Sequence, residues 1–523
     1  MSFTNWILFF LIIQIIHFLG TWRLYKKAGR KPWEAAIPIY NGLVLMKIIK
    51  RPWWWVILLF IPIVNLIMFP VVWVETVRSF GKTSTTDTIL AVVTLGLYIY
   101  YINYFSAANY REDRSLHPGS AAGEWISSIL FAVVAATIVH TYVMQPFTIP
   151  TSSLEKTLLV GDYLFVSKFH YGARTPITAV AFPMVHDTIP YFGVKSYLND
   201  PHIPYFRLPG FQDIERNDIV VFNWPVDTVR MFRDRSGIRY DKPIDKKSNY
   251  VKRAVGLPGD SLEIIQGKVY INGAPLELPD RAKPQYSYTG TTRGGTLDPY
   301  TLYKMYGITD GFYQDPATNQ FFIQALSDEA YLRLRNHPEV ASLEKVLSPP
   351  GEADPAIFPN NGKVDWNRDN FGPIYIPKKG QTVQMNLENF SLYRQIIENY
   401  EGREMGLDNK LSVRGREVLL NGSPLETYTF KQDYYWMMGD NRHNSEDSRY
   451  WGYVPENHVV GKPVFIWLSL DPNASGLDSV RWDRMFTTVG GEGEPVSYFP
   501  YFMILLVGFL GYSFFRKKKK TAK

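Results

Sequence analysis

Cysteine is absent from the 523-residue sequence, and only 20% of its residues are charged. The absence of cysteine excludes a disulfide scaffold, a thiolate zinc site, thiolate-held iron–sulfur chemistry and a cysteine nucleophile. The formal net charge of +7 is too small for this length to indicate a nucleic-acid groove. The Gly-x-Ser-x-Gly and His-Glu-x-x-His motifs are missing, and the histidines lack metal-ligand spacing. The sequence therefore predicts no nucleic-acid partner, no metal and no other cofactor.

Five apolar stretches are long enough to cross a bilayer, which takes about 20 residues of helix. They cover residues 3–22, 54–74, 88–105, 125–144 and 496–515. Pro62, Asn65 and Pro70 interrupt the second stretch, so a re-entrant hairpin is the alternative there. The first stretch has no basic segment before it and no small-x-small site after it, so we interpret it as a retained anchor. The mean hydropathy of −0.14 predicts a sizeable polar domain as well.

Basic residues give the expected orientation, because they concentrate in cytoplasmic loops. Eight Lys and Arg residues lie between the first two stretches, and five more follow the last one at 516–520. This pattern predicts an N-terminus outside the cytoplasm, an extracytoplasmic region from about 145 to 495 and a cytoplasmic tail at 516–523. The protein is thus expected to be multi-pass, with three candidate spans in residues 1–124.

The extracytoplasmic region is expected to be mainly β. Short β-type runs separated by Gly, Pro and Asn-Gly turns predict an antiparallel β domain. Two similar segments, GKVYINGAPLE from Gly267 and GREVLLNGSPLE from Gly415, each predict a strand, an Asn-Gly turn and a second strand. Residues 283–410 differ in composition and carry helical patterns, so we expect an inserted α+β subdomain there. The catalytic β domain would then consist of residues 145–282 and 411–495.

Two short segments of this region place a serine and a lysine in unusual surroundings. Ser153 follows Met144 by nine residues, in Ile-Pro-Thr-Ser-Ser-Leu-Glu-Lys-Thr-Leu, at a junction where serines commonly cap turns. Lys252 lies in the apolar strand pattern Tyr-Val-Lys-Arg-Ala-Val-Gly, on the same face as Tyr250. Burial disfavours the ammonium form of a lysine, and a neutral lysine can act as a general base. A surface lysine on an edge strand is the alternative.

A third segment, residues 437–452, is too polar for a core strand. It reads Met-Met-Gly-Asp-Asn-Arg-His-Asn-Ser-Glu-Asp-Ser-Arg-Tyr-Trp-Gly and contains His443, the one histidine in a dense polar run. Charges and hydroxyls at this density indicate the hydrogen-bonded wall of an active site. A solvated loop with ion pairs and a calcium loop are the alternatives, and the missing glycine at the sixth position weakens the second.

These three segments, with 217–222 between the first two, resemble the sequence boxes of bacterial type I signal peptidases, which are membrane-bound Ser/Lys endopeptidases. The resemblance covers about 145–270 and 431–471. It implies that Ser153 is the nucleophile and Lys252 the general base. It also implies that the Thr151 hydroxyl stabilises the oxyanion and that Ser445 hydrogen-bonds and orients the lysine. Four charged residues would brace the site: Arg253, Asp440, Asp447 and Arg449.

Two positions depart from the family pattern Ser-Met-x-Pro-Thr-Leu, since Leu154 replaces the Met and Lys156 replaces the Pro. Ser152 supplies a second hydroxyl, so the choice of Ser153 depends on the register of the match. Nine extended residues reach at most about 30 Å, which keeps the predicted nucleophile close to the bilayer surface. A signal peptide is cut just outside its apolar segment, so this position suits that substrate.

As a whole, the resemblance implies a signal-peptidase-like catalytic domain that removes N-terminal signal peptides after small-x-small sites, without a cofactor. The implied partners are signal-peptide-bearing pre-proteins, the lipid bilayer and the secretion translocon. The implied location is the bacterial inner membrane, with the catalytic domain on the periplasmic side. Three alternatives stay open: a Ser/Lys membrane protease with another dedicated substrate, a non-catalytic homologue that binds signal peptides, and a structural membrane protein.

Overall fold

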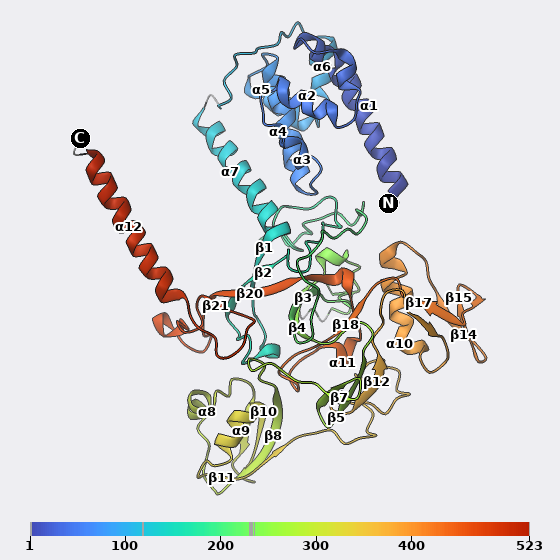
Figure 1. Cartoon of the computed structure of the whole chain (residues 1–523), viewed down its shortest axis with the longest axis vertical. Coiled ribbons are helices and arrows are strands. Elements are labelled where there is room, and N and C mark those ends of the chain that lie inside the picture. Colours follow the sequence, from blue (N-terminus) through green and yellow to red (C-terminus); the bar gives the residue numbers. More distant parts are fainter. Residues whose placement is uncertain (1–2, 118–119, 230–233, 235, 522–523) are drawn as a thin grey trace. The chain divides into compact units, whose positions relative to one another are not determined.

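In the computed structural model the described residues are 3–117, 120–229, 234 and 236–521, and they form two units (Figure 1). The first unit contains Met1–Val143, Arg174–Leu208 and Asp241–Lys246. The second contains Met144–Ala173, Pro209–Tyr240 and Lys247–Lys523. In the predicted basic tail, residues 522–523 and the side chains of 517–521 lie outside the described part of the chain.

The first unit is helical. Its helices are α1 (Phe3–Lys27), α2 (Tyr40–Ile48), α3 (Trp55–Leu58), α4 (Val64–Ser79), α5 (Thr85–Val93), α6 (Tyr98–Tyr104) and α7 (Ala121–Ile138), which continues as a π-helical turn over Val139–Val143. Helix α6 packs against α1. There the Tyr100 hydroxyl donates to the Ile16 carbonyl at 2.6 Å, and the Leu24 N–H donates to the Asn103 side chain at 3.1 Å. These contacts hold the two helices together within the first unit.

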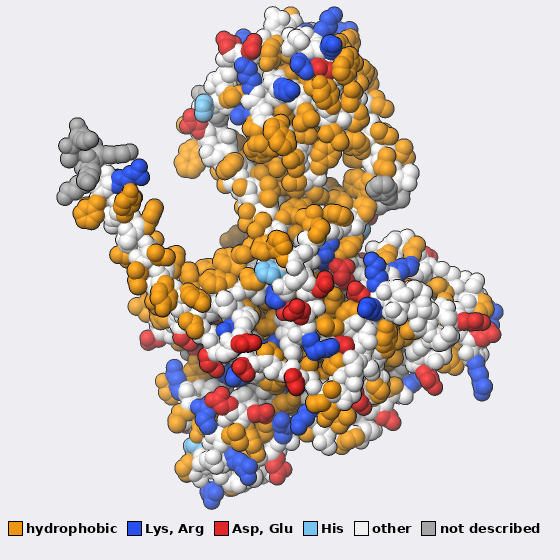
Figure 2. Space-filling model, in the orientation of Figure 1, with side chains coloured by type: hydrophobic (Ala, Val, Ile, Leu, Met, Phe, Trp, Pro, Cys, Tyr) orange, Lys and Arg blue, Asp and Glu red, His pale blue; other side chains and the backbone are white. Residues whose placement is uncertain are grey.

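Among the described residues, three helices are long and apolar enough to cross a membrane: Thr4–Lys27, Ala121–Val143 and Phe499–Arg516. Few of their residues are buried within the molecule. Figure 2 shows hydrophobic side chains along α12 (Phe499–Thr521) as far as Phe515, and many of them are exposed. A helix in lipid presents such an apolar surface on all sides. Three of the five predicted spans are therefore helices of the expected length.

The prediction of five spans is wrong, because residues 54–74 do not form one helix. The chain breaks between α3 and α4, where Pro62 lacks the N–H that would continue the helix and Ile63 has a left-handed backbone with φ 70°. Residues 88–105 bend by 115° between α5 and α6. Gly96 is required at this bend, since its φ is +83° and a Cβ would lie 2.8 Å from the Trp73 ring. In the described part of residues 1–124, one helix is thus long and apolar enough to cross a membrane by itself, and the bent pair α5–α6 adds a second only if it counts as one broken span.

Two segments expected in the β domain belong to the helical unit instead: Arg174–Leu208 and Asp241–Lys246. The Asp245 carboxylate accepts hydrogen bonds from two backbone N–H groups of the longer segment, both at 3.0 Å. The Trp6 Nε1–H donates to the His202 carbonyl at 2.9 Å, which ties the longer segment to the start of α1. The β domain therefore does not include the whole of 145–282.

The second unit is built mainly of antiparallel strands, which confirms the predicted fold class in outline. Its largest sheet has the order β1-β2-β20-β3-β4-β18-β19, with β21 beside β20. The strands are β1 (Met144–Thr148), β2 (Asp162–Ser167), β3 (Ile219–Asn223), β4 (Asn249–Gly256), β18 (Tyr434–Met438), β19 (Val454–Pro455), β20 (Val459–Ser469) and β21 (Thr487–Thr488). All residues of β3 and β18 are buried, as expected for strands inside a core.

Two smaller sheets contain the hairpins predicted from the similar segments. One has the order β12-β5-β6-β7 and the other β14-β15-β16, and β13 (Thr382–Gln384) pairs with β17 (Thr427–Thr429). The bounds are β5 (Ser261–Ile265), β6 (Lys268–Ile271), β7 (Ala274–Pro275), β12 (Phe371–Tyr375), β14 (Leu411–Arg414), β15 (Glu417–Leu420) and β16 (Ser423–Pro424). In both turns the Asn and the Gly have positive φ: 53° and 83° for Asn272 and Gly273, and 53° and 85° for Asn421 and Gly422. This is the backbone of a two-residue type I′ turn.

The predicted insert, 283–410, divides into two parts. The first forms its own sheet of order β11-β8-β10-β9 with α8 (Pro299–Tyr306) and α9 (Asp328–Leu334) packed into its core. These strands are β8 (Gln285–Thr292), β9 (Phe312–Asp315), β10 (Gln320–Ser327) and β11 (Val340–Lys345). The second part is not separate, because β12 pairs with β5 and Ile357 and Ile397 pack in one cluster with Trp436. The insert is therefore a subdomain only over its first half.

Candidate active site

The three polar segments singled out in the sequence meet beside β4. Ser153 lies in the short 3₁₀ helix η3 (Ser152–Leu154), Lys252 lies in β4, and the third segment follows β18. The Lys252 amine and the Ser153 hydroxyl are hydrogen-bonded, with Nζ and Oγ 2.5 Å apart. Their residues are only 3% and 8% exposed. Lys252 pairs with β3, and β18 pairs with β4 only from Arg253 onward, so Lys252 lies at an open edge of β4. Its burial nevertheless excludes a surface lysine.

Burial lowers the pKa of the Lys252 amine from 10.5 to about 8, because the ammonium form loses its hydration. The carboxylates of Asp447 and Glu446 oppose this shift, whereas the Arg449 guanidinium adds to it. With a pKa of about 8, about one amine in ten is neutral at pH 7, against about one in three thousand for an ordinary lysine. The site therefore holds an amine that can accept a proton near neutral pH.

The two adjacent serines point to different partners. The Ser152 hydroxyl accepts a hydrogen bond from the Asn444 side-chain amide at 3.2 Å, so it is engaged away from the lysine. Asn441 fixes the backbone of both serines: its side chain donates to the Ser152 carbonyl and its N–H to the Ser153 carbonyl, both at 3.1 Å. Sequence reasoning missed both asparagines. Their signal was their place inside the polar segment 437–452.

Hydrogen-bond donors are available beside the nucleophile. Thr151 precedes η3 in an extended conformation, and its side chain makes no capping hydrogen bond. The first N–H groups of a helix lack partners within it, which leaves the Ser153 N–H available. A hydroxyl and a backbone N–H that converge on one oxygen stabilise an oxyanion. The role of Thr151 in stabilising an oxyanion stays a prediction.

The hydrogen bond predicted between Ser445 and Lys252 is absent from the described structure. Ser445 is 7% exposed, and its Oγ is a buried atom without a hydrogen-bond partner. A Cβ added to Gly439 would lie 2.2 Å from that Oγ and 2.5 Å from the Ser153 carbonyl, so only glycine fits between them. The Lys252 amine is instead engaged with Ser153. Ser445 thus lies against the nucleophile segment with its hydroxyl unused, an arrangement that costs about 1–3 kcal/mol when no partner is supplied.

Arg253 links the lysine strand to the polar segment. Its guanidinium binds both oxygens of Asp440, Nε to Oδ1 at 2.8 Å and Nη2 to Oδ2 at 2.6 Å, and the pair is almost fully buried. The Thr157 hydroxyl donates to the same carboxylate at 2.7 Å. Burial raises the pKa of Asp440, but Arg253 and Thr157 outweigh it, so the pKa is lowered and the carboxylate stays ionised. Arg253 and Asp440 therefore join β4, the nucleophile segment and the loop after β18.

Asp447 and Arg449 form a second buried pair, with Nε to Oδ1 at 2.9 Å and Nη2 to Oδ2 at 2.8 Å. Asp447 Oδ2 also accepts the Gly439 N–H at 3.0 Å, and Arg449 donates to the Arg442 carbonyl at 2.6 Å. These hydrogen bonds join the two ends of the loop between β18 and α11 (Ser448–Trp451). The four charged residues predicted to brace the site are thus all inside its hydrogen-bond network.

The first half of the insert reaches the nucleophile segment, which sequence reasoning did not foresee. Asp310 Oδ2 accepts from the side-chain amides of Asn441 and Asn444, at 2.9 and 3.2 Å. The Lys156 amine donates to the Gly307 carbonyl. Lys156 has φ +72°, a left-handed backbone that proline cannot adopt. The backbone of this chain at position 156 is therefore one that the proline of the family pattern could not form.

His443 joins the polar segment to both halves of the insert. Its Nδ1 accepts the Ser287 N–H at 3.0 Å, and its Nε2 lies 2.8 Å from Asp369 Oδ1. Nδ1 as acceptor requires that Nε2 carry the proton and donate it to Asp369. Burial lowers the pKa of His443, although Asp369 partly opposes this, which keeps the imidazole neutral. We therefore assign His443 a structural role. Among the described residues no cluster of three or more His, Asp or Glu is placed to hold a metal ion.

Comparison with known proteins gives two family matches. The model described as "Signal peptidase, peptidase S26" matches residues 122–314 and 375–468, together more than half of the chain. The unmatched residues between these ranges lie in the insert. A second model, described as a family of unknown function (DUF5684), matches residues 33–113 in the helical unit.

Curated proteins named "Signal peptidase I" are similar over most of their length. The protein of Buchnera aphidicola subsp. Acyrthosiphon pisum is 25% identical over 348 residues, which are 66% of this chain and 76% of that protein. The Haemophilus influenzae protein is 24% identical over 399 residues, 72% of this chain and 79% of its own. The Helicobacter pylori protein is 25% identical over 382 residues, 70% of this chain and 92% of its own.

Proposed function

The chain belongs to the peptidase S26 family of signal peptidases, and from this premise we propose that Ser153 and Lys252 are its catalytic pair. As a member of that family it is a membrane serine endopeptidase that removes signal peptides from exported pre-proteins. The observation that carries the residue assignment is the 2.5 Å hydrogen bond between two side chains that are both buried. A serine hydroxyl becomes a nucleophile only when an adjacent base takes its proton.

In the proposed acylation step, the neutral Lys252 amine takes the Ser153 proton while Oγ attacks the carbonyl carbon of the scissile bond. The Thr151 hydroxyl and the Ser153 N–H donate to the oxyanion that forms. Losing one such donor typically costs about 2.7–4 kcal/mol of transition-state stabilisation. The Lys252 ammonium then gives its proton to the departing amine, and the C–N bond breaks. The signal peptide is left as an ester on Ser153.

In the proposed deacylation step, Lys252 takes a proton from water, and the resulting hydroxide attacks the ester carbonyl. The same oxyanion donors stabilise the second tetrahedral intermediate. Its collapse returns the proton to Ser153 Oγ and releases the signal peptide with a free carboxylate. Arg could not replace Lys252 in either step, because its guanidinium stays protonated. No step requires a metal.

We propose that the cleavage region binds as an extended strand along β4. Strand β18 pairs with β4 only at Arg253, Ala254 and Gly256, which leaves the edge before Arg253 unpaired on that side. An extended peptide can add to such an edge through its backbone. On the face opposite to Lys252, Val251 packs with Ile149 and Leu154. An apolar wall this close to the chain suits the small side chains of a small-x-small site.

The protein is an inner-membrane protein, and we propose that it spans the membrane three times, through α1, α7 and α12. The helices α3–α4 and α5–α6 would then be re-entrant hairpins. Two arginines that flank these hairpins support this, because Arg51 and Arg114 both contact Glu75 Oε2, at 3.0 and 2.6 Å, and so lie on one side. An odd number of spans keeps the N-terminus and the catalytic unit in the periplasm and the basic tail in the cytoplasm. Contact with the secretion translocon stays a prediction.

Cleavage of a tagged pre-protein by the purified full-length protein in detergent tests the proposed function. Mass mapping should locate one cut, after a small-x-small site. Ser153→Ala and Lys252→Ala should each give no product. Ser152→Ala is the matched control and should keep substantial activity, because the Ser152 hydroxyl is bonded to Asn444 rather than to Lys252. Loss of cleavage in Ser152→Ala with retention in Ser153→Ala would show that the register is wrong.

A further inference from the structure

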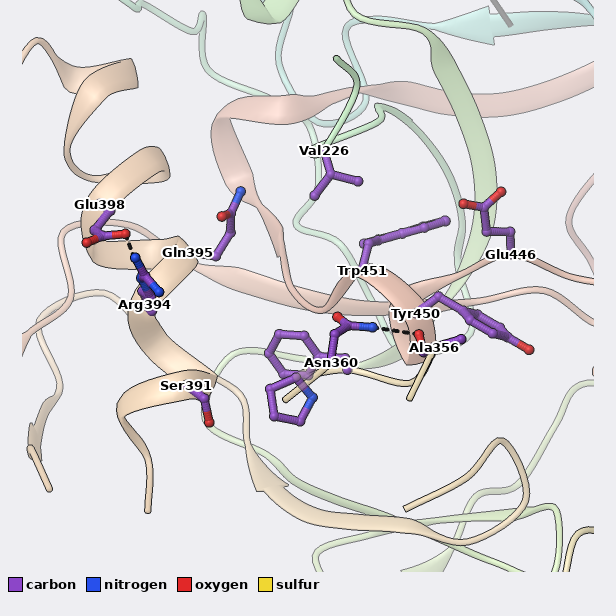
Figure 3. Close-up of a pocket in the computed structure, with 12 residues that line it drawn as sticks. Val226, Ala356, Asn360, Ser391, Arg394, Gln395, Glu398, Glu446, Tyr450 and Trp451 are labelled. Carbon is purple, nitrogen blue, oxygen red and sulfur yellow. Dashed lines mark hydrogen bonds and ion pairs between the residues drawn. The ribbon is translucent and has the colours of Figure 1, made fainter. Parts of the chain in front are cut away.

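A cavity of about 680 Å³ lies between the end of the polar segment 437–452 and the second half of the insert (Figure 3). Its walls come from the end of the polar segment, from the insert loop before β12 and from α10 (Phe390–Gln395) with the turn that follows. Figure 3 shows Glu446 on one side of the cavity and Arg394 and Glu398 on the other, with Trp451 between them. This volume is within the range of about 300–1,000 Å³ that is typical of binding sites.

Two residues of the cavity wall, Glu446 and Trp451, connect it to the proposed catalytic pair. Glu446 directly follows Ser445, and its charge acts on the Lys252 amine. The Trp451 ring stacks on the Tyr250 ring, with centroids 5.4 Å apart and planes 11° apart. The Tyr250 ring in turn lies 5.6 Å from Lys252 Nζ. A peptide that leaves the scissile bond past Lys252 therefore meets the Glu446 and Trp451 side of the cavity.

The two faces of β4 separate the two parts of the substrate. Val251 and the apolar wall proposed for the signal peptide lie on one face, whereas Tyr250 and Lys252 lie on the other. Lys252 returns its proton to the departing amine, which is the nitrogen of the first mature residue. The first mature residues thus begin on the Lys252 face, which contacts the cavity-lining Trp451 through Tyr250. This step rests on the proposed function.

The lining of the cavity favours a positive charge. On the wall opposite Glu446, Arg394 Nε lies 2.9 Å from Glu398 Oε2, so the two charges of this ion pair neutralise each other. Within the described part of the chain, the Glu446 carboxylate makes no hydrogen bond or ion pair, and its one attractive charge is the more distant Lys252 amine. The aromatic rings of Tyr450 and Trp451 also line the cavity, and aromatic faces attract cations. The side nearest the proposed catalytic pair therefore combines one unpaired carboxylate with two aromatic rings.

We propose that this cavity binds the first residues of the mature polypeptide and that Glu446 selects substrates with a basic side chain there. Glu446 is then a specificity-determining residue, and it acts on the half of the substrate that leaves first. Second-half residues of the insert, which the sequence predicted as a separate body, supply the opposite wall. The insert would thus take part in substrate choice.

The test uses purified full-length protein and pre-proteins that differ only by Arg, Gln or Glu at mature positions one to three, changed one at a time. At about pH 9 the amine of Lys252 is mostly neutral, so differences in its protonation contribute little. We expect kcat/KM to fall in the order Arg, Gln, Glu at one of these positions, with an Arg-to-Glu ratio of about fivefold, as for one exposed ion pair. Glu446→Gln should bring this ratio close to one.

Two further variants complete the design. Gln395→Lys adds a positive charge to the opposite wall and should also reduce the ratio, which provides a second variant if Glu446→Gln does not fold. Glu417→Gln, on the exposed side of β15, is the matched control and should keep the wild-type ratio. A wild-type ratio of one at all three positions would overturn the subsite while leaving the proposed function intact. A ratio that both cavity variants leave unchanged would overturn it as well. Failure of the wild type to cut any of the pre-proteins would overturn the proposed function together with this inference.

Discussion

The pH dependence of cleavage follows directly from the buried amine of Lys252. Only the neutral amine can take the Ser153 proton, so kcat/KM should rise with pH and reach half of its maximum at the pKa of about 8. Below that pH each unit should lower the rate about tenfold. An ordinary lysine would put the midpoint near 10.5. Rates between about pH 6 and about pH 10, with a pre-protein that carries Gln at the first mature positions, give the profile.

The Glu446→Gln variant tests whether the midpoint of the pH profile reports the ionisation of Lys252. The Glu446 carboxylate raises the pKa of Lys252, so its loss should lower that pKa and move the midpoint to a lower pH. The rate at pH 7 should then increase, because a larger fraction of the amine is neutral. A wild-type midpoint near 10.5 would contradict the buried, desolvated lysine. A midpoint that Glu446→Gln leaves in place would show that the titrating group is not Lys252.

Three further predictions concern the same residue and the absence of a metal-dependent step. Lys252→Met should raise the free energy of unfolding at pH 7 by up to about 3 kcal/mol, because the folded state has a pKa of about 8 and the unfolded state 10.5. The free energy of unfolding of the wild type should accordingly rise as pH increases between these two values, and Lys252→Met should lose this rise. Denaturation of the two proteins in detergent at several pH values measures it. Equal free energies of unfolding at all pH values would refute the prediction. Lys252→Arg should be inactive in the cleavage assay, and robust turnover by it would remove the lysine-base mechanism. EDTA should leave the cleavage rate unchanged, whereas inhibition that added metal reverses would reopen the question of a metal.

The local features of the fold were predictable because they are encoded in short stretches of sequence. The Asn-Gly pairs at 272–273 and 421–422 determine their turns through positive φ, which few residues other than Asn and Gly adopt readily. Lys252 is predictable because apolar residues surround it in β4, and that strand is buried from Lys252 to Gly256. Both inferences need no knowledge of distant contacts.

What the sequence did not predict depends on long-range packing. Asp310 reaches the nucleophile segment only because the insert folds back on it, and no local pattern marks that contact. The association of Arg174–Leu208 with the helical unit is of the same kind. Residues 54–74 differ from the prediction for another reason. Their length and hydropathy are those of a span, but Ile63, with its positive φ, turns the chain between two helices. The unpaired hydroxyl of Ser445 depends on the exact position of Gly439.

Covalent trapping tests the central claim most directly. A phosphonate ester that imitates the end of a signal peptide reacts with the nucleophile that the protein activates, and mass mapping of the digested adduct identifies the residue. The account predicts modification of Ser153 in the wild type, and none in Lys252→Ala under the same conditions, since the hydroxyl is activated only by that amine. A phosphonate on Ser152, or equal modification of Ser153 with and without Lys252, would contradict it.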